Sequence, residues 1–319
     1  MLCIRLKNND PYFCLAAEEY LLRNFEEDIF ILWQSYNAVV VGKHQNLLAE
    51  INYPFCRERK ISLARRISGG GTVFHDSGNV NFAFIKSVAN PAEVSFRYFT
   101  KPIIEALAKL QIPAEISGRN DLVVSGRKIS GNAEHIFKNR VLHHGTLLFN
   151  SDLKNLGQAI KVVPGKYRSK AVESNRNAVS NISGYLRKKM TTEEFIRFLL
   201  DFQLENSINK EYAFNEYDKT EILKLVEDKF STREWIYGYS PPYSFKNNVE
   251  IGNKQLEVDL EVKKGLIQEC LISGSYFPAE TLRMISSGLI NQEHNFDSVR
   301  ETLRSFMPGV PENAIYAFF

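Results

Sequence analysis

The sequence has no long uninterrupted hydrophobic run. Hydrophobic residues make up 44% of its 319 residues, but no stretch reaches the roughly 18 apolar residues of a membrane-spanning helix. The first residues, MLCIRLKNNDPYF, also lack the order of charged, apolar and small residues that marks a secretory signal. We therefore expect a cytoplasmic protein with no membrane partner.

Cysteine is scarce, with four residues in the whole chain. Cys3, Cys14, Cys56 and Cys270 lie far apart in the sequence, and none belongs to a CxxC pair. This spacing predicts neither a structural zinc site nor a framework of disulfides. Free and mostly buried thiols in a reducing compartment fit the pattern best.

The chain also lacks an excess of charge of one sign. Its 40 Lys and Arg residues nearly balance 37 Asp and Glu residues, which leaves a formal net charge of +3. That balance gives no global electrostatic reason to bind nucleic acid. The composition is that of an ordinary globular protein, long enough for a large domain and a smaller one. Our default expectation for the assembly is a monomer.

Helical and strand patterns alternate along the chain. Apolar residues at helical spacing predict helices at 11–25, 91–112, 191–205 and 216–229. Between them, short segments rich in β-branched and aromatic residues predict strands. These strand segments are 29–34, 38–43, 61–68, 71–76, 79–86, 114–117, 121–126, 127–137 and 140–149. The order favours an α+β fold with a mixed or antiparallel sheet over an array of βαβ units.

Two further predictions concern the pairing and the burial of these strands. Segments 29–34 and 38–43 are separated by only three residues, so they are predicted to pair as a hairpin. Segment 79–86 alternates apolar residues with asparagine and alanine, which predicts a strand buried on one face.

A cluster of Pro, Gly and Asn at 237–248, YGYSPPYSFKNN, predicts a domain boundary. We place a catalytic domain at 1–238 and a small accessory domain at 239–319. The second range has the pattern of a small sheet followed by two short helices.

The stretch RRISGGGTVFHDSGNVNF (65–82) puts three glycines beside two arginines. Glycine lets the backbone approach a bound group, and the planar forks of Arg65 and Arg66 suit phosphate or carboxylate. Together they predict an anion-binding corner. A hairpin turn with two solvated arginines is an equally good reading of this stretch by itself. The stretch lacks both the GxxxxGKS and the GxGxxG phosphate-binding patterns.

Three later stretches carry further candidates. In GRNDLVVSGRKISGNAEHIF (118–137), Lys128 lies between glycines inside a strand pattern, although a solvated edge lysine explains it as well. In VLHHGTLLF (141–149), the two adjacent histidines must point to opposite faces of a strand, so one of them could reach a site. The polar, basic segment 166–182 reads as a solvated loop, or as a mobile lid over an anionic ligand.

At these motifs the chain resembles the lipoate–protein ligase A family. The segments VVVGKHQN, ARRISGGGTVFHDSGNVNF, GRNDLVVSGRKISGNA and HHGTLLFN match that family's signature in order and spacing. The resemblance spans about residues 10–185, and the region after about residue 240 resembles the family's accessory domain. It implies the catalytic core shared by biotin ligases and class II aminoacyl-tRNA synthetases, with a small α+β domain at the C-terminus.

The resemblance also implies an activity. Such a ligase uses MgATP to convert lipoate, or octanoate, into the acyl-AMP plus pyrophosphate. It then transfers the acyl group to a lysine of a lipoyl domain. The partners implied are the E2 subunit of a 2-oxoacid dehydrogenase and the glycine cleavage H protein.

Site residues follow from the resemblance motif by motif. Lys128 falls at the family's central lysine, which contacts both the acyl carboxyl group and the phosphate. A cation there reduces the repulsion between two anions and stabilises charge that develops on phosphorus. The resemblance places the following residues at ATP: Arg66, Gly71, Thr72, Val73, Phe74 and Lys128. It places Lys128, Gly70 and His144 at lipoate, Lys170 and Arg176 on a lid, and Asn79 and Asp121 as further candidates, with Mg²⁺ held by ATP rather than by a fixed protein site.

One motif departs from the family. Its loop usually reads like SVRSRVTN, whereas this chain has SNRNAVSN, which keeps Arg176 but has Ala178 where a second arginine is common. This departure keeps open an alternative, a transferase that accepts a preformed acyl-nucleotide or a carrier-bound acyl group and activates poorly with ATP. A transferase that uses a cysteine thioester is disfavoured, because all four cysteines lie outside the motif segments.

Overall fold

The computed structural model describes residues 1–319 except 91–94, 119 and 175–176. It divides into two compact units, each built from three separate segments of the chain. The first unit comprises Met1–Lys43, Ile61–Gln158 and Ser174–Thr232. The second comprises His44–Lys60, Ala159–Glu173 and Arg233–Phe319. The second unit thus contains the whole range 239–319 together with two earlier segments, and the sequence-based boundary at 238 stays a prediction.

The first unit is built around a mixed sheet of eight strands. In spatial order these are β12 (Lys210–Glu211), β1 (Leu2–Arg5), β2 (Ile29–Trp33), β6 (Asn79–Ser87), β10 (Arg140–Leu148), β9 (Arg127–Phe137), β8 (Asp121–Val124) and β7 (Glu115–Ser117). Strand β1 is parallel to both of its neighbours, and the other neighbouring strands are antiparallel. The predicted mixed sheet is confirmed.

A second sheet in this unit has three strands, in the order β4 (Ser62–Arg65), β3 (Ala38–Val41) and β5 (Val73–His75). It shows that the predicted hairpin of segments 29–34 and 38–43 is wrong. Strand β2 pairs with β1 and β6, whereas β3 pairs with β4 and β5. Period-2 patterning marks a strand but carries no information about its partner, so two strands separated by a short link need not pair with each other.

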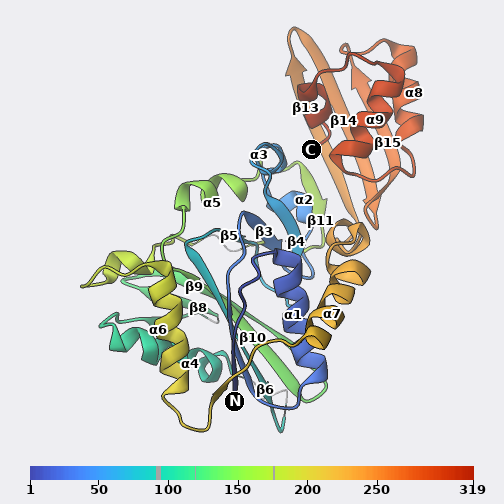
Figure 1. Ribbon diagram of the computed structural model, residues 1–319. Helices are drawn as coiled ribbons and strands as arrows, with labels where there is room; N and C mark the ends of the chain where they lie inside the picture. Colours follow the sequence, from blue (N-terminus) through green and yellow to red (C-terminus); the bar gives the residue numbers. More distant parts are fainter. Residues whose placement is uncertain (91–94, 119, 175–176) are drawn as a thin grey trace. The chain divides into compact units, whose positions relative to one another are not determined.

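Helices cover both faces of the large sheet (Figure 1). Helices α4 and α6 lie on one side, and α1 and α7 lie on the other. The helical segments of this unit are α1 (Pro11–Asn24), α4 (Phe96–Lys109), α6 (Thr192–Leu204), α7 (Glu216–Leu225), and the short turns η2 (Ile182–Tyr185) and η3 (Val226–Phe230). Helix α5 (Leu153–Ala159) ends one residue inside the second unit.

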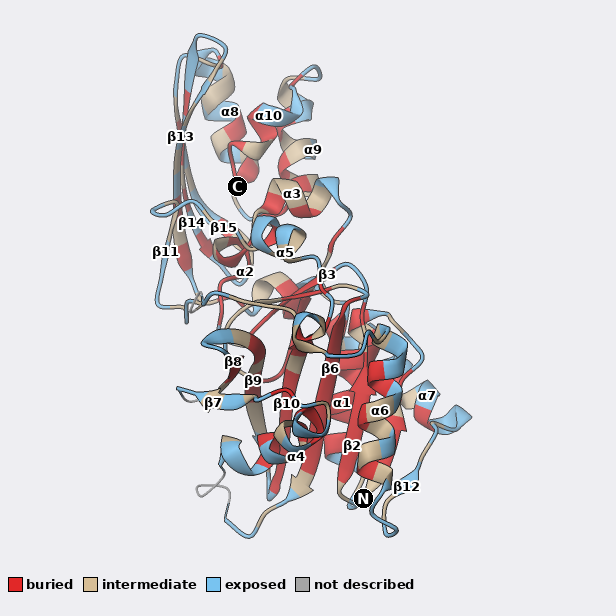
Figure 2. Ribbon diagram, turned by 90° about the vertical axis from the view of Figure 1, so that its left-hand side faces the viewer, coloured by how far each residue is buried: buried red, intermediate tan, exposed pale blue. Residues whose placement is uncertain are grey.

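Strand β6 is buried along most of its length, which corrects the prediction of a half-buried strand. Residues 79–85 are all buried, and the central strands β2, β6 and β10 are coloured mostly as buried in Figure 2. Val80, Phe82 and Phe84 pack into the apolar core beneath α4 and α6, as their alternation predicts. The opposite face is closed by α1, so its asparagines are buried too. The predicted helix 91–112 is observed as α4, and residues 91–94 lie outside the described residues.

The second unit has a four-stranded sheet in the order β11 (Tyr167–Ser169), β13 (Tyr243–Ile251), β14 (Lys254–Lys263) and β15 (Leu266–Gly274). Its neighbouring strands are antiparallel. The helical segments of the unit are α2 (Leu47–Glu50), α3 (Tyr53–Glu58), η4 (Glu234–Gly238), α8 (Ala279–Leu289), α9 (Phe296–Phe306) and α10 (Glu312–Tyr316). The prediction of a small sheet followed by two short helices is confirmed by β13–β15, α8 and α9.

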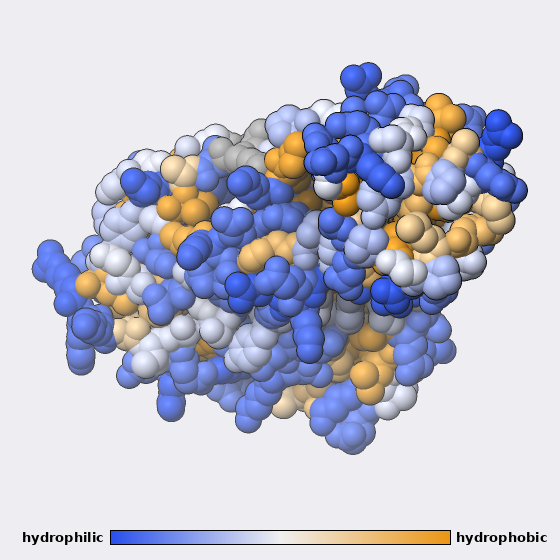
Figure 3. Space-filling model, turned by 90° about the horizontal axis from the view of Figure 1, so that it is seen from above, coloured by the Kyte–Doolittle hydropathy of each residue, from blue (hydrophilic) through white to orange (hydrophobic). Residues whose placement is uncertain are grey.

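Hydrophilic side chains cover most of the molecular face seen in Figure 3, with smaller hydrophobic patches among them. No helix within the described residues is both long and apolar enough to cross a bilayer. All four cysteines are free; Cys3, Cys14 and Cys56 are buried, and Cys270 is partly exposed.

Candidate functional site

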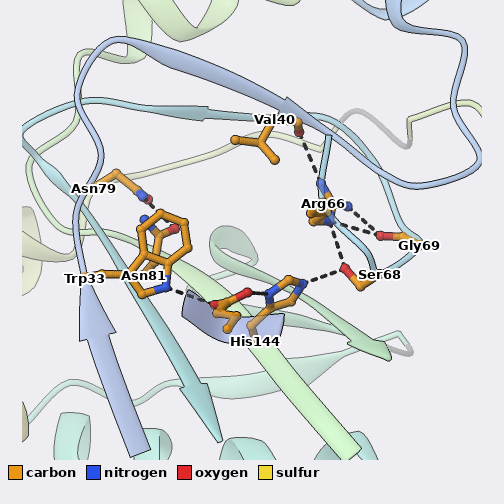
Figure 4. Close-up of polar contacts among 9 residues, drawn as sticks. Trp33, Val40, Arg66, Ser68, Gly69, Asn79, Asn81 and His144 are labelled. Atoms are coloured by element: carbon orange, nitrogen blue, oxygen red, sulfur yellow. Dashed lines mark hydrogen bonds and ion pairs between the residues drawn. The ribbon is translucent and has the colours of Figure 1, made fainter. Parts of the chain in front are cut away.

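The three glycines belong to a loop that connects β4 to β5, and we call residues 66–72 the glycine loop. The Arg66 side chain holds this loop together from inside. Its Nη2 donates to the carbonyl oxygens of Gly69 at 2.6 Å and Gly71 at 2.7 Å, and its Nη1 donates to Val40 at 3.1 Å. Its Nε donates to Ser68 Oγ at 3.0 Å (Figure 4). The guanidinium that the sequence assigned to ATP is therefore aimed at the loop's own carbonyls.

Burial affects both arginines of this segment. Arg65 is fully buried, and its Nη1 donates to the carbonyl oxygens of Gly42 and Lys43. Arg66 is 6% exposed. Desolvation lowers the pKa of Arg66 to about 10, partly opposed by the charge of Glu18, so the guanidinium stays protonated at neutral pH. The reading of two solvated arginines beside an ordinary turn is excluded.

The shape of the loop depends on two glycines. Gly70 has a φ of +85°, a conformation that residues with a Cβ rarely adopt. Gly42 lies at the end of β3, and a Cβ there would come within 2.2 Å of the Gly70 carbonyl oxygen. The glycine in VVVGK thus leaves the space into which the loop folds.

Lys128 lies near the start of β9 and forms an ion pair with Asp121 on β8. Its Nζ is 2.8 Å from Asp121 Oδ1, and the two side chains are 23% and 13% exposed. A Cβ on Gly131 would come within 3.0 Å of the Lys128 Nζ, so this glycine makes room for the ammonium group. The lysine is consequently a half-buried, positioned cation and not a solvated edge lysine.

Ser174 contacts the glycine loop, and residues 177–180 contact Asp121 and Lys128. Ser174 Oγ accepts a hydrogen bond of 2.9 Å from the Thr72 amide, and Asn177 Nδ2 donates to Asp121 Oδ2 at 2.8 Å. The Lys128 amide donates to the Ala178 carbonyl oxygen, and the Lys128 carbonyl accepts from the Ser180 amide, each at 2.9 Å. Residues 177–180 are therefore held against β8 and β9 rather than free in solvent.

The two adjacent histidines of β10 point to opposite faces of the sheet, as predicted. His143 stacks on Phe99 of α4, with 5.1 Å between ring centroids, and its Nδ1 is 2.9 Å from Glu134. His144 faces α1, where its Nδ1 lies 2.7 Å from Glu18 Oε2. Its Nε2 lies 2.6 Å from Ser68 Oγ in the glycine loop. His144 therefore belongs to the site, and His143 belongs to the core.

Asparagine side chains on β6 contribute unpaired polar atoms to the same face of the sheet. Asn79 Nδ2 donates to Asn81 Oδ1 at 3.1 Å (Figure 4). Asn79 Oδ1 and Asn81 Nδ2 are buried and have no hydrogen-bond partner among the described residues. Buried polar groups are nearly always paired in folded proteins, so these two atoms fit a ligand contact.

The predicted nucleotide segment continues from the loop into β5. Val73 and Phe74 pair with β3, and β5 is the outer strand of its three-stranded sheet. Its other edge is not paired within that sheet, which leaves a backbone edge beside the glycine loop. This arrangement fits the expectation that backbone atoms at 71–74 read an adenine edge.

The two lid candidates, Lys170 and Arg176, are not among the site residues described above. Lys170 is exposed and belongs to the second unit. Arg176 lies outside the described residues. The other sequence-predicted site residues all belong to the first unit, on the glycine loop and strands β5, β6, β8, β9 and β10.

Three residues of this candidate site, Glu18, Gly42 and Ser68, were not predicted from the sequence. Glu18 on α1 is 1% exposed and accepts a hydrogen bond of 2.9 Å from Trp33 Nε1 on β2. Ser68 connects Arg66 to His144. Glu18 was missed because EE in YFCLAAEEYLL has the pattern of the polar side of a helix, whereas Ser68 lies in the motif ARRISGGG and could have been found. Gly42 could have been found, since it lies in the motif VVVGKHQN.

Comparisons with known proteins identify the family of this chain. The sequence profile of the lipoyl protein ligase A/B catalytic domain matches residues 10–202, and that of the bacterial lipoate protein ligase C-terminus matches residues 240–314. Lipoate–protein ligase 1 of Staphylococcus aureus is 38% identical over 299 residues, which cover 93% of this chain and 91% of that protein.

Solved structures show the same fold. A bi-partite lipoate protein ligase from Thermoplasma acidophilum, described with its E2 lipoyl domain, has a TM-score of 0.65 and 24% identity; the match covers 75% of this chain and 96% of that one. A lipoate-protein ligase A bound with ATP has a TM-score of 0.63 and 23% identity, with coverage of 75% and 98%. The expected α+β fold with a C-terminal accessory region is confirmed.

Proposed function

The chain belongs to the lipoyl protein ligase A/B family, and we infer from this membership that it is an ATP-dependent lipoate–protein ligase. The observation in its own structure that supports this reading most directly is the positioned cation of Lys128. Its Nζ lies 2.8 Å from Asp121, and its backbone is hydrogen-bonded to Ala178 and Ser180.

In the first half-reaction, a carboxylate oxygen of lipoate attacks the α-phosphorus of ATP. An O–P bond forms to give lipoyl-AMP, and the bond between the α-phosphorus and the bridging oxygen breaks to release pyrophosphate. Lys128 Nζ would lie between the two anions, reducing their repulsion and stabilising charge that develops at phosphorus. Asp121 keeps the ammonium group oriented until a substrate oxygen replaces it as the partner.

The nucleotide would lie along the glycine loop and the outer edge of β5. Gly70 and Gly71 let its phosphates or base approach the backbone, and Thr72, Val73 and Phe74 follow directly along that edge. Arg66 acts indirectly: it fixes the carbonyl groups of the loop, and its positive charge attracts the phosphates.

Mg²⁺ would enter with the nucleotide. No group of three His, Cys, Asp or Glu side chains suited to a metal occurs within the described residues. The buried amide oxygen of Asn79, which has no partner among the described residues, is a donor of the kind that Mg²⁺ accepts alongside phosphates and water. When bound with the nucleotide, Mg²⁺ would supply charge neutralisation for the pyrophosphate leaving group.

In the second half-reaction, the neutral amine of an acceptor lysine attacks the acyl carbonyl of lipoyl-AMP. A C–N bond forms, the bond to AMP breaks, and the amine loses a proton. We propose the lipoyl domain of a 2-oxoacid dehydrogenase E2 subunit as acceptor, with the glycine cleavage H protein as a second acceptor, and octanoate as a second acyl substrate. We further propose that the protein acts as a cytoplasmic monomer, with Lys170 and Arg176 on a lid and 239–319 as an accessory domain.

One experiment tests the proposal. Purified protein is given lipoate, MgATP and an apo lipoyl domain, and the mass of the domain is followed. Gain of one lipoyl group with release of pyrophosphate is the expected result. No modification in this mixture, together with modification from preformed lipoyl-AMP, would favour the transferase alternative. Burial of the cysteines already disfavours a thioester route, because it raises the pKa of Cys3 to about 11 and that of Cys56 to about 12.

A further inference from the structure

We propose that Glu18, His144 and Ser68 are positioning residues that hold the glycine loop in its ATP-binding shape through a buried hydrogen-bonded chain. This inference rests on the proposed function and extends it. It predicts that a glutamate on helix α1, which acts on the glycine loop through His144, controls affinity for the nucleotide.

The chain is continuous from helix α1 to the carbonyls of the glycine loop. Glu18 Oε2 lies 2.7 Å from His144 Nδ1, and His144 Nε2 lies 2.6 Å from Ser68 Oγ. Ser68 Oγ accepts from Arg66 Nε at 3.0 Å, and Arg66 in turn donates to the carbonyls of Gly69 and Gly71. The dashed lines in Figure 4 trace this path from Trp33 through the carboxylate to His144, Ser68 and Arg66.

The donors in this chain all point one way. Arg66 Nε has only a hydrogen to give, so Ser68 Oγ accepts from it, and the Ser68 hydroxyl hydrogen is left for His144 Nε2. His144 then carries its hydrogen on Nδ1 and donates it to Glu18. Trp33 Nε1 donates to the other oxygen of the same carboxylate. Glu18 thereby fixes the tautomer of His144, and the tautomer fixes the direction of the Ser68 hydroxyl.

The residues of this hydrogen-bonded chain are all buried, which strengthens each hydrogen bond. Glu18 and Ser68 are each 1% exposed, and Arg66 and His144 are nearly as buried. Water does not compete at such positions, and a carboxylate at one end of the chain balances a guanidinium at the other. Replacing Glu18 by Gln removes that charge and lets the amide donate to His144 Nδ1. The tautomer would then reverse, and Ser68 would have to accept from both His144 and Arg66.

His143, on the opposite face of strand β10, provides a matched control. His143 is paired with Glu134 at 2.9 Å in the same manner, but its ring packs against Phe99 and has no link to the glycine loop among the described residues. Glu134→Gln therefore removes the carboxylate partner of another buried histidine and leaves the hydrogen bonds among Glu18, His144, Ser68 and Arg66 intact.

The experiment compares wild type, Glu18→Gln, Ser68→Ala and Glu134→Gln. The dissociation constant of ATP is measured by calorimetry without lipoate, and the KM of ATP is measured at saturating lipoate by pyrophosphate release. We expect both constants to rise about tenfold in Glu18→Gln and Ser68→Ala, the usual effect of losing a buried hydrogen bond to a charged group. Glu134→Gln should match wild type.

A second readout addresses the tautomer directly. Long-range ¹H–¹⁵N spectra of the labelled protein should show the hydrogen of His144 on Nδ1 in wild type and a shift of population to Nε2 in Glu18→Gln. A purely structural role for Glu18 would lower the melting temperature without changing this spectrum or the ATP constants at a temperature where the variant is folded.

Unchanged ATP constants in both chain variants, with only the KM of lipoate altered, would overturn the inference. So would an Nε2 hydrogen in wild type. If Ser68→Ala fails to fold, Glu18→Gln decides alone, because glutamine keeps the volume of glutamate. Wild-type protein that makes no lipoyl-AMP would instead contradict the proposed function, and the two failures are thus distinguishable.

Discussion

The ammonium group of Lys128 and the carboxylate of Asp121 lie 2.8 Å apart on neighbouring strands β9 and β8. The same carboxylate accepts a hydrogen bond from Asn177. Asp121 therefore contacts both the predicted catalytic lysine and Asn177. The lysine is held in position in advance of substrate binding, which is the condition for electrostatic stabilisation without reorganisation.

Replacing Lys128 by Ala should lower the rate of adenylate formation by about 10²–10³, the usual loss when one preorganised group is removed. The rate is measured as lipoate-dependent pyrophosphate release. Lys109→Ala, an exposed lysine of α4, should retain the wild-type rate. Equal rates for Lys128→Ala and wild type would remove Lys128 from the mechanism.

The ion pair itself can be tested by a double-mutant cycle. Asp121→Asn keeps an oxygen for the lysine but removes the charge, so we expect a loss of about tenfold, smaller than that of Lys128→Ala. The double variant should be no slower than Lys128→Ala alone, because Asp121 acts through the lysine. Multiplication of the two separate losses would show that the residues act independently.

Gly42 and Gly69 give a matched pair for the shape of the glycine loop. A Cβ at position 42 would come within 2.2 Å of the Gly70 carbonyl, whereas a Cβ at position 69 meets no atom of the described residues within 4 Å. Gly42→Ala should reduce the free energy of unfolding by about 1–3 kcal/mol, the usual cost of overpacking. Gly69→Ala should be near neutral. Urea unfolding of both variants checks this, and equal stabilities would contradict the crowding argument.

Acid should destabilise the second unit through His294. Its Nε2 donates to the Phe318 carbonyl, and Tyr243 donates to its Nδ1. Desolvation lowers the pKa of His294 to about 4. Below about pH 6.5, the unfolded chain therefore binds a proton that the folded chain does not bind. The free energy of unfolding is thus unaffected by His294 above that pH and decreases as the pH drops towards 4.

The measurement is the free energy of unfolding between pH 7 and pH 4. His294→Asn should show a shallower loss with falling pH, by up to one proton or about 1.4 kcal/mol per pH unit. His44→Asn, at an exposed position, should keep the wild-type slope. The desolvated His75, with a pKa of about 3, accounts for part of the slope that remains. An unchanged slope in His294→Asn would refute the assignment.

The four cysteines should be dispensable for acyl transfer. Burial raises the pKa of Cys270 to about 12 and that of Cys14 well above its usual value, so neither supplies a thiolate at neutral pH. Replacing all four by Ala should leave transfer to the apo lipoyl domain within a few-fold of wild type. Circular dichroism verifies folding, and loss of transfer in folded protein would revive the thioester route.

Local patterns in the sequence predicted most of the elements. The spacing of apolar residues located α1, α6 and α7, and Gly126 marked the turn between β8 and β9. These features depend on residues close in the chain, where periodicity and turn chemistry act directly. The motifs likewise identified the family, because four of them occur together in the expected order and spacing.

Pairing and burial between distant segments could not be predicted in this way. The sequence placed 29–34 beside 38–43, but tertiary packing gave these strands to two different sheets. It also left the second face of β6 open to solvent, although α1 covers it. Strand partners are selected by the total burial of all segments together, which no short window contains.

The sequence by itself determined that this chain has the glycine loop, the lysine and the paired histidines of a lipoate ligase. Only the tertiary structure decided which way those groups point. It aimed Arg66 at its own loop and His144 at Glu18, more than a hundred residues away in the chain. Hydrogen bonds in a buried site depend on where donors and acceptors meet in space, and that meeting is set by the packing of the sheet against α1.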